Sequence, residues 1–156
     1  MSQVLTRSTW LPKPPAEVFP FFADAGNLAR ITPPELSFRI LTPLPIEMGV
    51  GALIDYRLAL FGVPFRWRTR ISAWDPPRGF IDEQVRGPYG KWVHSHVFEE
   101  ESGGTRMFDR VEYALPFDPL GRVALPWVRR RLERIFDYRT EVIAELLGGR
   151  AGPAGA

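Results

Sequence analysis

Most of the chain alternates between apolar and polar residues, which is the pattern of β-strands that bury one face. In the stretch 63–74, for example, Arg66, Arg68 and Arg70 share one face, and we expect that face to contact solvent. Similar stretches, separated by turns rich in proline and glycine, lie at 4–11, 36–42, 52–60, 80–86, 92–98 and 105–113. The pattern predicts an antiparallel sheet of about seven strands.

Two other parts of the chain have helical periodicity. Dense apolar positions from 17 to 23 follow Pro15, which suits a first helical turn, but Pro20 interrupts them. This helix is therefore expected to be short or broken, with a further helical turn at 27–31. From 125 to 147, intervals of three and four predict one long amphipathic helix whose buried stripe is Val128, Leu132, Ile135, Phe136, Val142 or Ile143, and Leu146.

The end of the long helix is marked by Gly148 and Gly149, since glycine is the usual residue just beyond a helix C-terminus. No internal repeat or interior linker divides the sequence before that point. We therefore expect one domain over residues 1–147 and a disordered tail over residues 148–156.

Both histidines lie in one predicted hairpin, WVHSHVF and TRMFDRVEY around Gly103–Gly104. Because alternate side chains share a face, His94 and His96 lie on the same side of the first strand as Trp92. A turn centred on the glycines places His96 opposite Asp109. An inner face that is both aromatic and polar predicts a lined cavity rather than a filled core.

The inward faces of three neighbouring strands can be projected with the simplest hairpin registers. One row then reads Asp82, His96, Asp109, and the next reads Gln84, His94, Val111. Phe136 and Arg139 of the long helix form the expected roof, and Tyr89 in the turn 87–90 is expected near the cavity mouth. The predicted ligand-binding residues are Tyr56, Trp67, Phe80, Asp82, Gln84, Trp92, His94, His96, Phe98, Met107, Asp109, Tyr113, Phe136 and Arg139.

The same polar residues allow three other interpretations. In the first, Asp82 and Asp109 satisfy His96 in a structural network that needs no ligand. In the second, His94 and His96 with one of these carboxylates hold an iron or zinc ion. In the third, the cavity is catalytic; flanking acids would raise the pKa of His96, so His94 would be the base. Our prediction is ligand binding, with no metal, cofactor or catalytic residue assigned.

Composition narrows the function classes. The net charge of +2 argues against nucleic acid as a partner, and the absence of cysteine excludes disulfides, thiolate metal sites and cysteine nucleophiles. No apolar run approaches the roughly 20 residues that a membrane span needs, and no signal peptide is visible, so we expect a cytoplasmic protein without stable membrane insertion. Many arginines and few lysines are typical of a thermophilic or GC-rich source. The cluster Arg129–Arg131 with Arg134 is expected to be a solvated helix face, with contact to an anionic surface as the alternative.

Several stretches resemble one family: PPAEVFPFFADAGNLARITPP, WRTRISAWDPPRGFIDEQVRGPY, WVHSHVF, GTRMFDRVEYALPFDPLG and LERIFDYR. Together they resemble the START-like superfamily, also called SRPBCC or Bet v 1-like, in the bacterial branch of polyketide cyclase/dehydrase and lipid-transport proteins. The resemblance spans residues 3–147. It implies an α+β helix-grip fold, in which a curved antiparallel sheet wraps a long C-terminal helix and two short helices follow the first strand.

For function, the resemblance implies a cavity that binds a small hydrophobic or amphipathic ligand, such as a lipid, a quinone or an aromatic polyketide-like molecule. The alternative is a cyclase or aromatase-type enzyme that uses the same cavity. A third class is an interaction module that uses the outer arginine face. The ligand's identity and the oligomeric state stay open at this point.

Overall fold

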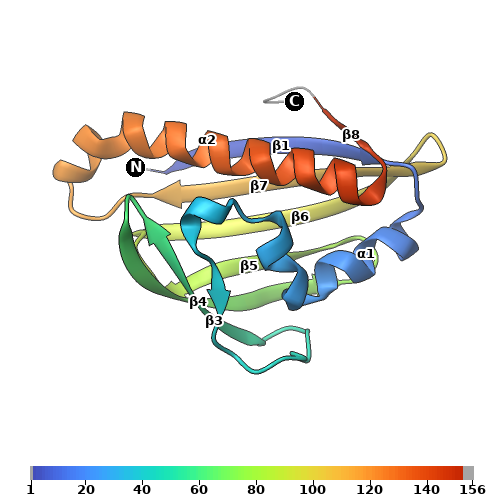
Figure 1. Cartoon of the computed structure of the whole chain (residues 1–156), viewed down its shortest axis with the longest axis horizontal. Coiled ribbons are helices and arrows are strands. Elements are labelled where there is room, and N and C mark those ends of the chain that lie inside the picture. Colours follow the sequence, from blue (N-terminus) through green and yellow to red (C-terminus); the bar gives the residue numbers. More distant parts are fainter. Residues whose placement is uncertain (1, 153–156) are drawn as a thin grey trace.

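The computed structural model describes residues 2–152 and has an α+β architecture (Figure 1). Within these residues the helical elements are α1 (Pro15–Ala23), the 3₁₀ helices η1 (Ala25–Ile31) and η2 (Pro34–Leu36), and α2 (Leu120–Leu147). The strands are β1 (Gln3–Leu11), β2 (Arg39–Ile40), β3 (Leu53–Leu60), β4 (Val63–Asp75), β5 (Gly79–Arg86), β6 (Lys91–Glu101), β7 (Gly104–Ala114) and β8 (Arg150–Ala151).

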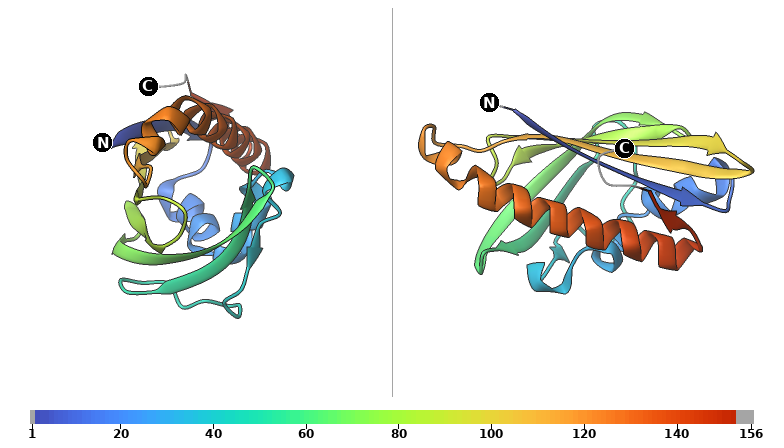
Figure 2. Two further views of the ribbon diagram at one scale, coloured as in Figure 1. Left: turned by 90° about the vertical axis from the view of Figure 1, so that its left-hand side faces the viewer. Right: turned by 90° about the horizontal axis from the view of Figure 1, so that it is seen from above.

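The strands described form one antiparallel sheet in the order β2-β3-β4-β5-β6-β7-β1-β8. The sheet curves beneath α2, which lies along its concave side, and α1 with the 3₁₀ helices closes the space between α2 and the β3 edge (Figure 2). This arrangement is the predicted helix-grip fold. No helix within residues 2–152 is both long and apolar enough to cross a membrane.

Two predicted elements have different boundaries in the structure. The stretch 36–42 was expected to be a strand, but Ser37 adopts a left-handed conformation with φ of 47°, and only Arg39–Ile40 pair with β3. The long helix begins at Leu120 rather than at 125, and Pro126 is accommodated inside it. Pro126 lies in the second turn of this helix, so it removes one intrahelical hydrogen bond, the one that an N–H at this position would donate to the carbonyl of Arg122.

The tail after α2 departs from the prediction in part. Gly148 has a φ of 73° and its N–H donates to the carbonyl of Ala144, as expected for a helix end. Arg150–Ala151 then pair with Thr9 and Trp10 of β1 as β8, a short strand that the prediction did not include. Residues 153–156 of the predicted tail lie outside the described residues.

The buried side chains form two apolar clusters. One gathers α1 against the ends of the strands, and the other packs the middle of α2 on β4, β6 and β7. On β6, Phe98 belongs to the first cluster and Trp92 to the second, and His94 and His96 lie between them on the same face. The polar inner residues are therefore enclosed by apolar packing on both sides.

The stripe of α2 that faces the sheet supplies a test of this packing. Of the two alternatives at positions 142 and 143, Ile143 is the buried one, with none of its surface exposed, whereas Leu146 is 41 % exposed. We predict that Ile143→Ala lowers the free energy of unfolding by about 2–5 kcal/mol because it leaves a cavity. Leu146→Ala, the matched control, should change it by less than about 1 kcal/mol. Urea denaturation of both variants checks this; equal losses would contradict the helix register.

Candidate functional site

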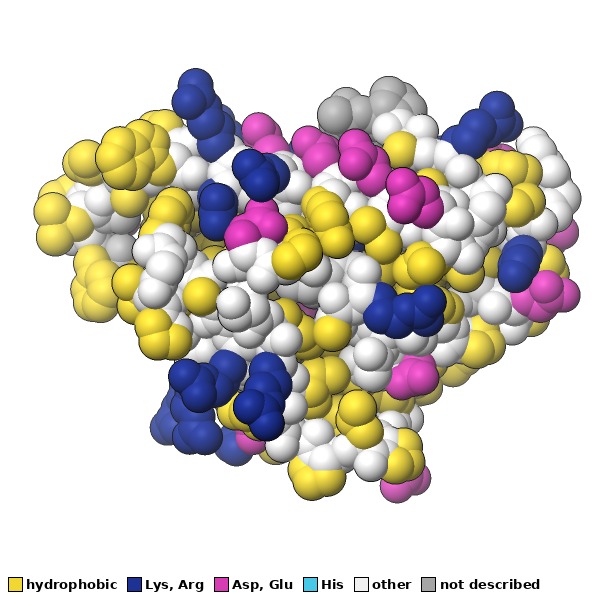
Figure 3. Space-filling model, viewed as in Figure 1, with side chains coloured by type: hydrophobic (Ala, Val, Ile, Leu, Met, Phe, Trp, Pro, Cys, Tyr) yellow, Lys and Arg dark blue, Asp and Glu magenta, His cyan; other side chains and the backbone are white. Residues whose placement is uncertain are grey.

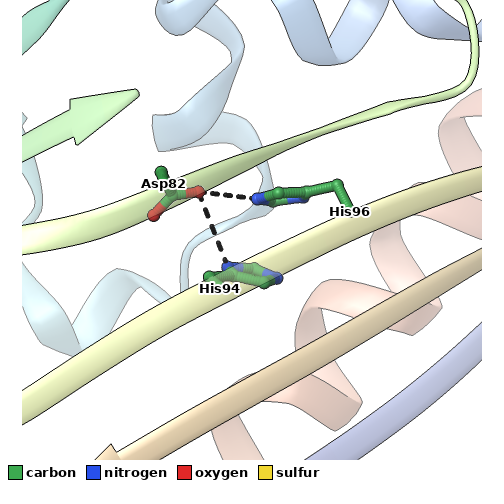
Figure 4. A group of neighbouring side chains, drawn as sticks. All are labelled: Asp82, His94 and His96. Atoms are coloured by element: carbon green, nitrogen blue, oxygen red, sulfur yellow. Dashed lines mark hydrogen bonds and ion pairs between the residues drawn. The ribbon is translucent and has the colours of Figure 1, made fainter. Parts of the chain in front are cut away.

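The two histidines of β6 project inward from the middle of the sheet. His94 and His96 are both buried, and β7 pairs with β6 in the predicted register, with His96 opposite Asp109. Figure 4 shows the two imidazoles and the Asp82 carboxylate from the adjacent strand pointing toward one another. Three strands thus bring the polar residues of the prediction into one group.

The predicted register between β5 and β6 is wrong by two residues. Asp82 pairs with His94, not with His96, and Phe80 takes the place opposite His96. Gln84 accounts for the shift: its amide donates to the carbonyl of Tyr89 at 2.8 Å, and the N–H of Tyr89 donates back at 3.1 Å. These bonds hold a wider turn than the simple hairpin that the prediction assumed. A Cβ at Gly87 would overlap the end of the Gln84 side chain, so a larger residue there would require Gln84 to shift.

The carboxylates and histidines bind diagonally across the sheet. Asp82 Oδ2 lies 2.7 Å from His96 Nε2, although His94 is its direct neighbour. Asp109 Oδ1 lies 2.7 Å from His94 Nε2, although His96 is its direct neighbour. Diagonal pairs are within reach of long side chains on one sheet face. The result is a crossed network in which each histidine is held by the carboxylate diagonal to it.

Arg139 closes this network from α2. Its Nε and Nη2 each lie 3.3 Å from an oxygen of Asp109, and Nη2 lies 3.5 Å from His96 Nδ1. The imidazoles of His94 and His96 stack with ring centroids 3.7 Å apart, and Phe80 stacks on His96 at 4.0 Å. Because Arg139 and Asp109 are both buried, each charge depends on the other for compensation.

The surroundings shift the pKa values of the network. Burial would raise the pKa of Asp109, but Arg139 and His94 hold it well below its usual range. Burial likewise opposes ionisation of Asp82, yet the hydrogen bond to His96 and the charges around it lower its pKa. Both carboxylates are therefore ionised at neutral pH.

His96 departs from the sequence prediction, which expected flanking acids to raise its pKa. Burial, reinforced by the neighbouring His94, lowers the pKa of His96 to about 4, and the hydrogen bond and charge of Asp82 offset only part of this. Burial destabilises the charged imidazolium more than the nearby carboxylates stabilise it. His96 is consequently neutral at pH 7 rather than cationic.

Two adjoining cavities, each of about 130 Å³, lie above this network between the sheet, α2 and the 3₁₀ helices. The first reaches the polar group, and the second extends toward the β3–β4 turn. Seven residues line both: Leu28, Ile31, Tyr56, Trp67, Trp92, His94 and Arg139. Most of the wall is apolar or aromatic; its charged side chains are Asp82 from β5, Arg139 from α2 and Asp24 from the junction of α1 and η1.

The structure brings most of the predicted site residues to these cavities. Eight line the first: Tyr56, Trp67, Phe80, Asp82, Trp92, His94, His96 and Arg139. Phe136 lines the second, as does Tyr89 of the turn. Five lie outside both walls: Asp109 supports the histidines from below, Gln84 binds the turn, and the other three pack in the apolar clusters, namely Phe98, Met107 and Tyr113.

Sequence reasoning missed the wall opposite the sheet. It is formed by residues of α1, η1 and the loop after β2, including Phe21, Phe22, Asn27, Leu28 and Met48. The irregular, proline-rich stretch around them has no periodicity to assign an inner face. Thr69 was also missed; its hydroxyl hydrogen-bonds the Tyr56 hydroxyl at 3.1 Å. The alternation of Trp67 and Thr69 on β4 was the signal that could have identified it.

Trp67 has an unusual environment for a buried tryptophan. It is 5 % exposed and lines both cavities, yet among residues 2–152 its indole N–H has no hydrogen-bond partner. A buried donor without an acceptor carries a desolvation cost of about 1–3 kcal/mol. A molecule in the cavity that offers an acceptor would remove this cost.

The geometry also bears on the metal interpretation. The candidate ligand atoms of Asp82, His94 and His96 all lie within 4.8 Å of one another, so these three residues could hold a cation (Figure 4). However, Asp82 already accepts from His96, and the guanidinium of Arg139 lies 3.5 Å from the same imidazole. A cation at these atoms would have to displace the hydrogen bonds they already make, which favours the hydrogen-bonded network.

The depressed pKa of His96 gives a testable pH dependence. In the unfolded chain a histidine binds its proton near pH 6.5, whereas folded His96 does so only near pH 4. The unfolded state therefore binds more protons between these values, and stability falls as the pH drops through this window. We predict that this group removes about 2 kcal/mol of stability between pH 7 and pH 4.5. In urea denaturation, His96→Gln should lack this part of the decline; an unchanged pH slope would contradict the assignment.

Comparisons with known proteins agree with this geometry. Residues 11–137 match the family model for polyketide cyclase/dehydrase and lipid transport. Among curated proteins, no significant sequence match is found. Solved structures match over nearly the whole chain, at identities that establish the fold alone.

Three of these structures illustrate the likeness. The Zhui aromatase/cyclase from Streptomyces sp. R1128 has a TM-score of 0.76 at 16 % identity, covering 95 % of this chain and 94 % of its own. TTHA0849 from Thermus thermophilus has a TM-score of 0.74 at 18 % identity, covering 92 % and 95 %. Major latex-like protein 151 from Panax ginseng has a TM-score of 0.63 at 14 % identity, covering 94 % and 97 %.

The predicted order of elements, the adjoining cavities beneath α2 and the family match over most of the sequence lead to one assignment: the chain belongs to the polyketide cyclase/dehydrase and lipid-transport family of the Bet v 1-like, or SRPBCC, superfamily.

Proposed function

We propose that this protein binds a compact hydrophobic molecule with one polar end in the cavities between the sheet and α2. The observation that carries the proposal is the composition of the wall. Aromatic side chains cover most of it, and a charged, hydrogen-bonded group with the unpartnered Trp67 N–H lies at its polar side. Apolar walls with a few placed polar groups are typical of small-molecule sites.

The volume of the cavities limits the size of the ligand. A dry cavity of about 150 Å³ holds one benzene molecule, so each cavity of about 130 Å³ accommodates roughly one six-membered ring. Joined through their shared wall, they would hold a bicyclic molecule. Among the predicted ligand classes, this favours a ring-containing molecule over a long-chain lipid, which would require α2 or η1 to move outward.

The polar side of the cavity would orient such a ligand. The Trp67 N–H is a donor without an acceptor, which suits a carbonyl or hydroxyl oxygen. Ionised Asp82 lies along the same wall and adds an acceptor, since its carboxylate can accept more than the one hydrogen bond from His96. A phenol, a naphthol or a quinone-type molecule has the matching combination of ring and oxygen.

The first test is to identify what the protein carries. Native mass spectrometry of freshly purified protein, followed by solvent extraction, should reveal a stoichiometric mass that leaves on denaturation. We predict that His96→Gln reduces retention of this mass several-fold because it disturbs the polar wall. Arg68→Ala, on the exposed outer face, should retain it fully. Equal retention by the two variants would contradict the proposed orientation.

A defined probe makes the second test independent of any co-purified molecule. For 2-naphthol, which has two rings and one oxygen, we predict that Trp67→Phe weakens binding about five- to tenfold, because one hydrogen bond to a buried donor is lost while the aromatic wall is kept. Trp74→Phe is the matched control, since Trp74 packs on Phe19 and Phe80 and lines neither cavity. Isothermal titration calorimetry measures both. Equal dissociation constants for the two variants would rule out the proposed role of Trp67.

A cyclase-type enzyme is the second candidate function, and the stacked imidazoles favour it. His94 and His96 are buried beside two carboxylates at the edge of a cavity, and such groups can move a proton to or from a bound ketone. A linear β-polyketone incubated with the protein would distinguish the functions. A binding protein returns it unchanged, whereas an enzyme cyclises it and loses that turnover in the His94→Ala variant.

A further inference from the structure

One end of the molecule exposes an unusual set of large apolar side chains. Phe117 is 80 % exposed, Leu120 73 %, Val123 80 % and Trp127 75 %. All four lie within the loop before α2 and its first turns, and Figure 3 shows hydrophobic side chains gathered over this end of the helix. Isolated exposed apolar residues are ordinary, but a contiguous group of this size marks an interaction surface.

The geometry of α2 places these side chains on one face. Leu120, Val123 and Trp127 are separated by three and four residues, so they project in nearly the same direction over about 10 Å of helix. The tip of the β3–β4 hairpin adds Phe61, which is 59 % exposed and borders the same surface hollow as Trp127. We call these five side chains the apolar tip: Phe61, Phe117, Leu120, Val123 and Trp127.

Positive charge follows the apolar tip along the helix. Residues 117–134 contain five arginines and two acidic residues, a net charge of +3. Arg130, Arg131 and Arg134 continue the face of Trp127 and line the hollow with it, and the Arg131 guanidinium lies 5.9 Å from the centre of the Phe61 ring. Figure 3 shows basic side chains next to the hydrophobic ones at this end.

We propose that this end docks on the surface of an anionic lipid bilayer, with the apolar tip inserted at the headgroup boundary and the arginines against the lipid phosphates. Interfacial helices combine Trp and aliphatic residues on one face with arginines, and they insert about 5–10 Å. Each basic residue near an anionic surface contributes about 1 kcal/mol. Phe117, Leu120 and Val123 are 73–80 % exposed and line no hollow among the described residues. The net positive charge beside them suits an anionic lipid surface better than a second copy that carries the same net charge.

Docking here would bring the bilayer next to the second cavity. Leu60 lines that cavity, and its neighbour Phe61 belongs to the apolar tip. The same helix that presents Trp127 continues into the cavity wall through Leu132 and Phe136. A hydrophobic molecule dissolved in the membrane would therefore reach the protein beside its binding space. The docking itself does not depend on the ligand.

Vesicle flotation tests the proposal with the full chain. The wild-type protein should float with phosphatidylcholine vesicles that contain one-third phosphatidylglycerol, bind pure phosphatidylcholine vesicles more weakly, and lose affinity at about 0.5 M salt. Val123→Ser/Trp127→Ser should weaken binding at least about tenfold. Val50→Ser changes a residue of similar exposure, 71 %, that is far from the tip in sequence, and this variant should bind as the wild type does. Arg130→Glu should weaken binding to the anionic vesicles more than Arg66→Glu, which makes the same change of charge on the outer sheet face.

Three results would overturn the proposal: no flotation of the wild type, equal flotation of the serine variants at the tip and at Val50, or a wild-type dimer in light scattering that the tip variant dissociates. The last result would assign the apolar tip to a second copy. Near-UV circular dichroism and 2-naphthol binding of the tip variant, both expected to be unchanged, separate a docking defect from a folding or ligand-binding defect.

Discussion

A buried carboxylate must find partners, and in this fold Asp109 finds them on two different layers. From the sheet it accepts a hydrogen bond from His94, and from α2 it accepts two from Arg139. The Arg139 guanidinium is thereby drawn into the concave side of the sheet, which fixes how α2 lies across it. The apolar clusters on either side could be satisfied by several helix positions, because hydrophobic contact has no direction. The ion pair has one geometry, and leaving either partner unpaired would be strongly unfavourable.

Because α2 is held there, the cavity wall cannot simply collapse onto the histidines. The crossed pairing also binds the Nε2 atoms of His94 and His96 to Asp109 and Asp82. These bonds fix the orientation of the two stacked rings at the edge of the cavity. If this position were fully apolar, its side chains would pack together and fill the space. A polar group that must remain hydrogen-bonded makes the wall rigid. The aromatic residues around this group line the space between the sheet and α2 without filling it. The same pairing that satisfies the buried charges thus maintains the space proposed for the ligand.

Much of the fold follows from the sequence because period-two alternation is a strong local signal. It identified the long strands, and the Gly103–Gly104 turn was enough to pair His96 with Asp109. The errors fall where local signals are absent. Register between β5 and β6 depends on a side-chain bond from Gln84 to the turn, which no periodicity encodes. The start of α2 at Leu120 was missed because Phe117, Leu120 and Val123 are exposed, so the apolar pattern there does not describe a buried stripe.

The candidate site shows the same division between local and tertiary information. Residues on the strands were assigned to the correct face, whereas the wall from α1 and η1 was not assigned at all, since its position depends on how a proline-rich segment crosses the sheet. The pKa of His96 illustrates the limit most clearly. Neighbouring acids are visible in the sequence and predict an increase, but complete burial is a property of the assembled fold, and it reverses the sign. The exposed end of α2 is the converse case: side chains that would be read as core from their type alone lie outside it, and only the folded chain shows that they are available to a surface.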